Sequence, residues 1–149
     1  MTTKRVLITS SLSVLIISVL LLATGSSLLT KSFGGIPLGN LTTWAGFIAL
    51  QLSIYWGHSK FTKSNSILGK IIKTLIETLI VISFLWLAIA YILSGNINFT
   101  FKPSAGFQGS NEASNVFWNI NYCLVIAPIV LASIYNLLKL IEIRKERLK

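Results

Sequence analysis

The chain has 149 residues, of which 53% are hydrophobic and only 11% are charged, with 13 Lys or Arg against 4 acidic residues. An ordinary soluble domain carries about a quarter charged residues, so this composition excludes a typical soluble enzyme and indicates a membrane protein. The length allows one domain, 1–149. One histidine and one cysteine cannot supply a haem or zinc site, so we expect no metal and no cofactor.

Four apolar segments, at about 6–24, 42–57, 71–93 and 116–140, are candidates to cross a bilayer. A hydrocarbon core of about 30 Å needs roughly 20 apolar residues in a helix, and helices satisfy their own backbone groups in lipid. The sequence therefore predicts an all-α fold, an integral membrane four-helix bundle. We expect the first segment to be a retained helix, because its apolar run is longer than that of a signal peptide.

The basic residues are distributed unevenly between the predicted loops. If both termini lie on one side, the opposite side holds only Lys31 and Lys102 of the 13 basic residues. Cytoplasmic loops collect Lys and Arg, so this bias predicts that both termini are cytoplasmic, in a multi-pass protein of a bacterial inner membrane. The charge is thereby assigned to the lipid bilayer surface, and direct nucleic-acid binding is not expected.

The tail 141–149 is rich in helix-forming and charged residues. We expect the fourth helix to continue into the cytosol through this tail. Its basic residues Arg144, Lys145 and Arg147 either face solvent and headgroups or bind a cytosolic protein partner.

The second segment contains a row of small residues. Ala45, Ala49, Ser53 and Gly57 recur every four positions. Such a row lets another helix approach closely, which is how membrane helices associate. We call these four positions the small-residue row, and they predict helix packing either within the chain or between subunits.

Glu77 is the one acidic residue inside a predicted span. An ionisable residue in the membrane is a functional hypothesis by default, and here it suggests a proton or cation site. The chain is similar in size and helix number to small multidrug transporters. The alternative is structural: Lys73 lies one turn away and could pair with Glu77, while Thr74 and Thr78 could bond its oxygens.

Pro128 lies near the middle of the fourth segment. Proline has no N–H group, so it leaves the carbonyl of Leu124 without its helical partner and predicts a kink. In the third segment, Trp86 lies too deep for an interfacial belt and is expected at a helix contact.

The longest predicted outer loop spans about 94–115. Its stretch 98–103 alternates aromatic and polar residues, which predicts a short β-hairpin. Phe99, Phe101 and Phe107 are too apolar for a loop that only contacts water. We expect them either to cap the bundle at headgroup level or to form an outward recognition surface.

The sequence contains no paired carboxylates, phosphate-binding loop or nucleophile motif, so we expect no enzyme. The leading hypothesis is a non-catalytic membrane subunit that packs into a homo-oligomer or with other membrane subunits, with its cytoplasmic loop and tail available to a soluble partner. A small transporter or channel that uses Glu77 is another hypothesis.

The four-helix layout with a basic inner loop and a charged tail also resembles three kinds of protective protein. These are phage-exclusion proteins of the lambda type, the membrane subunit of the Kiwa defence system and immunity proteins against pore-forming bacteriocins. The resemblance is one of size and topology and transfers no residue. It implies a role in antiviral defence or bacteriocin immunity.

Overall fold

A computed structural model describes residues 3–58, 67–102 and 105–147, and nearly all of this part of the chain is helical. The helices are α1 (Thr3–Ala23), α2 (Leu38–Gly57), α3 (Ile67–Ser94) and α4 (Asn111–Arg147). Between α1 and α2 lie a short 3₁₀ helix, η1 (Ser27–Thr30), and two short strands, β1 (Ser32–Phe33) and β2 (Ile36–Pro37). The predicted all-α class is confirmed for the described residues.

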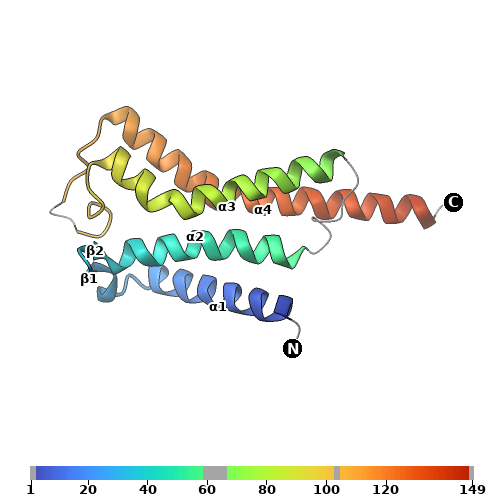
Figure 1. The fold of residues 1–149 in the computed structure, drawn as a ribbon, viewed down its shortest axis with the longest axis horizontal. Coiled ribbons are helices and arrows are strands. Elements are labelled where there is room, and N and C mark those ends of the chain that lie inside the picture. Colours follow the sequence, from blue (N-terminus) through green and yellow to red (C-terminus); the bar gives the residue numbers. More distant parts are fainter. Residues whose placement is uncertain (1–2, 59–66, 103–104, 148–149) are drawn as a thin grey trace.

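Helix α2 occupies the centre of the arrangement. It packs against α1 on one side and against α3 and α4 on the other, and α3 packs against α4 (Figure 1). The start of α1 and the end of α4 lie at the same end of the molecule, which we call the terminus end. The strands and the connection from α3 to α4 lie at the opposite end, which we call the hairpin end.

Three of the helices, α1, α3 and α4, are long and apolar enough to cross a membrane. Helix α2 was predicted to span as well, but it is not among them because it carries several polar residues. The structure buries those residues: the exposed fraction is 1% for Asn40, 0% for Gln51 and 9% for Ser53. The neighbouring helices, rather than solvent, surround the polar groups of α2. This central helix can therefore be less apolar in sequence than the other three.

The distribution of apolar residues is the reverse of that in a soluble protein. Large hydrophobic side chains are exposed on the outer faces of α1, α3 and α4, with Ile17 at 57% and Ile92 at 77%. Serines such as Ser11, Ser18 and Ser83 are buried between helices. In water so much exposed apolar surface would drive association, so the outer faces require an apolar environment.

The inner core joins α2, α3 and α4 through aromatic rings. Trp86 of α3 is 3% exposed, and its ring meets Phe47 of α2 edge-on at 5.5 Å and Phe117 of α4 at 6.2 Å. Its indole N–H donates to the Asn121 side-chain oxygen at 2.9 Å. The predicted helix contact at Trp86 is therefore confirmed, and Asn121 supplies the hydrogen bond that a buried indole requires.

The predicted hairpin at 98–103 is wrong over the described residues 98–102, which form turns. The Asn96 side-chain oxygen accepts hydrogen bonds from the backbone N–H groups of Asn98 and Phe99, and this Asx-type contact bends the chain out of an extended path. The hairpin occurs instead at β1–β2. Gly34 and Gly35, at φ 58° and 83°, supply the two positive-φ positions that a tight hairpin turn requires.

Gly109 is packed so closely that a methyl group cannot be added without movement. A Cβ atom there would collide with the backbone carbonyl oxygen of Leu93 and the ring of Phe107. We expect Gly109→Ala to lower the unfolding free energy by about 1 kcal/mol, because the loop must shift to remove the overlap.

A thermal unfolding measurement in detergent tests this, with Gly106→Ala as the matched control. A Cβ atom at Gly106 meets no atom within 4 Å. If the two variants melt at the same temperature, the close packing at Gly109 is refuted.

Candidate functional site

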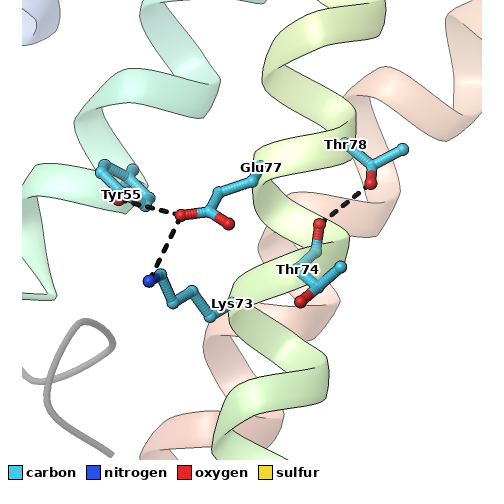
Figure 2. A network of polar contacts seen from close by, with 5 residues as sticks. All are labelled: Tyr55, Lys73, Thr74, Glu77 and Thr78. Carbon is cyan, nitrogen blue, oxygen red and sulfur yellow. Dashed lines mark hydrogen bonds and ion pairs between the residues drawn. The ribbon is translucent and has the colours of Figure 1, made fainter.

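The polar cluster around Glu77 lies between α2 and α3 near the terminus end (Figure 2). One carboxylate oxygen, Oε1, accepts a hydrogen bond from the Tyr55 hydroxyl at 3.1 Å and lies 3.6 Å from Lys73 Nζ. The side chain of Glu77 is 44% exposed and that of Lys73 is 36% exposed. The ion pair that the one-turn spacing predicts is therefore present, and both of its side chains are partly exposed.

The predicted threonine partners of Glu77 are not its partners. The Thr78 hydroxyl donates to the Thr74 backbone carbonyl at 3.0 Å, and Figure 2 shows both threonines on the other side of α3. A threonine in a helix commonly bonds the carbonyl one turn back, which removes its hydroxyl from other uses. The hydrogen bond to Glu77 comes instead from Tyr55 of α2. The sequence contained one indication of this contact, because α2 and α3 run antiparallel and both residues lie toward the terminus end of their helices.

This geometry makes Glu77 a poor candidate for a site that binds and releases a cation. Lys73 already neutralises the carboxylate, and Tyr55 fixes one of its oxygens toward α2. Among the described residues, no group of three or more His, Cys, Asp or Glu side chains could hold a metal ion. The arrangement connects α2 to α3 through the hydrogen bond from Tyr55 to Glu77.

We therefore expect Glu77→Gln to lower the unfolding free energy by less than about 1 kcal/mol, because half-exposed ion pairs contribute little. Chemical unfolding in detergent measures this, with Thr78→Val as a control on the opposite side of α3. The transporter hypothesis predicts instead that reconstituted vesicles show cation or proton flux and that Glu77→Gln abolishes it. Such a flux would refute the structural interpretation.

His58 makes a separate polar contact between the end of α2 and α4. Its Nδ1 lies 3.0 Å from the Ile54 carbonyl oxygen, and its Nε2 lies 3.2 Å from the Asn136 side-chain nitrogen. A carbonyl can only accept, so Nδ1 carries the proton in this arrangement and Nε2 accepts from Asn136. The ring also meets Tyr135 edge-on at 6.1 Å. His58 thus fixes the end of α2 against α4, and no pattern in the sequence indicates that Asn136 is its partner.

The small-residue row faces α1 over part of its length. Ala45 and Ala49 line a groove together with Ser11 and Val14 of α1, and a Cβ atom at Gly46 would lie 3.2 Å from Ser18 Cβ. Ala49 and Ser53 are buried, whereas Gly57 at the end of α2 is exposed. The row therefore contributes to packing within the chain, where α1 approaches α2.

The backbone position that Pro128 leaves open is occupied by a side chain of α2. The Gln51 amide donates from Nε2 to the Leu124 carbonyl oxygen at 2.8 Å, and Leu124 is the residue whose helical partner Pro128 removes. All three residues are fully or almost fully buried. Figure 1 shows α4 changing direction between its orange first part and its red second part. Sequence reasoning identified the free carbonyl but not its donor.

The three loop phenylalanines pack onto the bundle at the hairpin end. Phe99 and Phe107 meet edge-on at 5.1 Å, and Phe99 meets Phe117 of α4 at 5.2 Å. The Phe101 ring lies against Gly39, where an added Cβ atom would collide with it. This is the arrangement that a cap requires. Only the partly exposed edges of these rings remain for an outward recognition surface.

The expected continuation of the fourth helix is present, since α4 runs to Arg147. Arg144 is exposed on it. The side chains of Lys145 and Arg147 lie outside what the structure describes, as do most of the predicted cytoplasmic loop (59–66) and the last two residues of the tail.

Comparison with known proteins yields no relative from which a function could be transferred. No family model matches the chain, and no curated protein and no solved structure matches it significantly.

Proposed function

We propose that the chain is a four-pass integral membrane protein of the bacterial inner membrane with both termini in the cytoplasm. Exposed apolar faces on α1, α3 and α4, together with polar side chains buried between helices, support this proposal. Helix α2 crosses with the others because they cover its buried Asn40 and Gln51. The shared position of the termini at one end of the molecule fits an even number of crossings (Figure 1).

Within this topology, the protein acts as a non-catalytic subunit of a homo-oligomer or of a larger membrane complex. The observation that carries this proposal is the extension of α4 beyond α2. Asn136 lies level with the end of α2, because it contacts His58, and the helix continues to Arg147. Eleven residues of helix add about 16 Å.

The first part of the extension belongs to the apolar candidate span of α4, which ends at Ile141, so its exposed side chains lie at the cytoplasmic edge of the membrane. Leu137, Leu140 and Ile141 are all at least half exposed, and together with Ile143 and Arg144 they line a shallow hollow. An exposed apolar face next to a cation is typical of a contact surface. We infer that this face packs against another subunit or a soluble partner at the cytoplasmic side.

The test is a mass measurement on protein extracted directly from its membrane. In native nanodiscs, light scattering should give a fixed stoichiometry above one copy, either of this chain alone or with a second protein. Leu140→Gln should reduce that assembly, whereas the exposed Ile92→Gln, near the other end of the bundle, should leave it intact.

A lone monomer in native nanodiscs and in several mild detergents would refute the subunit proposal. A monomer whose loss makes cells sensitive to phage or to a bacteriocin would favour the protective hypothesis instead. The topology is tested separately by reporter fusions at both ends of the chain. Opposite placements of the two ends would refute four crossings.

A further inference from the structure

An apolar groove made of two neighbouring hollows lies between α1 and α2 on the outside of the molecule. Its part toward the terminus end has a volume of about 330 Å³, and its part toward the hairpin end has a volume of about 290 Å³. Val14 and Ala45 line both parts, so the two hollows are adjacent. The α1 wall follows one helix face, with Leu7, Ser11, Val14, Ser18 and Leu21 at spacings of three or four residues.

The part of the groove toward the terminus end presents almost no free polar group. Ser10 and Ser11 both lie in its wall, but their hydroxyls donate to backbone carbonyls of their own helix, those of Val6 and Ile8, at 2.5 and 3.0 Å. The floor of the groove is recessed because small residues such as Ala45 and Ala49 form it. An apolar, narrow and lengthwise hollow of this kind suits a hydrocarbon chain rather than water or a polar solute.

The length of the part toward the terminus end also fits one leaflet of a bilayer. It extends along α2 from Trp56 to Trp44, which is about 18 Å of helix. The distance from the edge of the hydrocarbon core to its midplane is about 15 Å. A single acyl chain that enters beside Trp56 therefore reaches the middle of the membrane within the groove.

One cation stands at the mouth of this part. Lys4 lies one turn before Leu7 and two turns before Ser11, on the helix face that lines the groove, whereas Arg5 lies on the other side of α1. Lys4 is exposed. Over the described ranges, the single ion pair is the one between Lys73 and Glu77, so no carboxylate there neutralises Lys4. The mouth thus has the charge that complements a lipid phosphate.

We propose that the groove binds one anionic phospholipid, with an acyl chain between α1 and α2 and the headgroup phosphate on Lys4. Ala45 and Ala49 of the small-residue row then form the floor of a lipid site. The proposal rests on the proposed topology only for the leaflet that supplies the lipid, which would be the cytoplasmic one. That leaflet is rich in anionic lipid and attracts basic residues near its surface.

The experiment is native mass spectrometry of the purified full chain with equal amounts of phosphatidylglycerol and phosphatidylcholine. We expect one phosphatidylglycerol molecule to be retained preferentially. Each basic residue near an anionic surface contributes about fivefold, so Lys4→Gln should reduce the preference by that factor. The matched control is Lys31→Gln at the hairpin end, which should keep the preference.

A second variant tests the acyl site independently of charge. Ala45→Leu puts a larger side chain into the groove at a half-buried position and should lower retention of both lipids. Melting in phosphatidylcholine nanodiscs shows whether the variant is folded. If it is not, the charge variants decide the question alone.

Three outcomes would overturn the proposal. They are equal retention of the two lipids, an unchanged preference in the Lys4→Gln variant, and a dimer that forms through the groove and is lost in Ala45→Leu. Each of them leaves the four-pass topology standing, because that is measured by the reporter fusions. Conversely, a failed topology would appear in the fusions whatever lipid is retained.

Discussion

Trp86→Ala should lower the unfolding free energy by about 3–5 kcal/mol, the largest effect that we expect from a single substitution. Trp86 contacts Phe47 of α2 and Phe117 of α4 through its ring and Asn121 of α4 through its N–H group. Its removal leaves a cavity at the junction of three helices, and the helices cannot close it without moving the aromatic cap.

One further variant separates the contribution of the ring from that of the N–H group, and a second serves as a control. Trp86→Phe keeps an aromatic ring against Phe47 but removes the hydrogen bond to Asn121, so we expect a loss of about 1–2 kcal/mol. The control is Trp118→Ala, since Trp118 lies on the outer face of α4 and is 44% exposed. Unfolding by steric trapping in bicelles measures all three. Equal losses for Trp86→Ala and Trp118→Ala would contradict this account of the core.

The helices could be predicted from the sequence because the signal for them is local. Apolar runs of bilayer length fix α1, α3 and α4 to within a few residues, apart from the longer ends of α3 and α4. The position of a turn depends on individual residues rather than on a long apolar run. The Gly34–Gly35 pair is the stronger hairpin signal, whereas the alternating pattern at 98–103 predicts a hairpin wrongly, because Asn96 bends the chain at its start.

The partners within the site could be predicted only in part, and the reason is physical. Lys73 lies on the same helix as Glu77, so helical spacing alone indicates the pair. Tyr55, Asn136 and Gln51 come from other helices, and their contacts depend on the rotation of α2 about its axis. Spacing within one segment carries no information about that rotation.

The polar residues of α2 illustrate the same point. In the sequence they weaken the evidence for a membrane span, and in the structure they are the groups that connect α2 to its neighbours. Asn40 donates to the Ile97 carbonyl at the hairpin end, and Gln51 donates to Leu124 in the middle. A central helix in a membrane can contain such residues, because the surrounding helices rather than lipid contact them.

Gln51→Leu should lower the unfolding free energy by about 1–3 kcal/mol, because it leaves the Leu124 carbonyl buried without a donor. The cost depends on Pro128. In Pro128→Ala the backbone N–H at position 128 returns and can bond Leu124 in the ordinary helical way. The carbonyl then no longer needs Gln51, so the same Gln51→Leu substitution should cost about 1 kcal/mol less in the Pro128→Ala background.

The double-mutant cycle tests this coupling independently of how much each single variant loses by changed packing. Ser53→Ala is the control on the same helix, since the Ser53 hydroxyl donates to Leu50 of its own helix and should show no coupling to Pro128. If Gln51→Leu costs the same in both backgrounds, the Gln51 amide is not replacing the hydrogen bond that proline removes. If the coupling is present, the kinked part of α4 is held by α2, and the polarity of α2 has a structural cause.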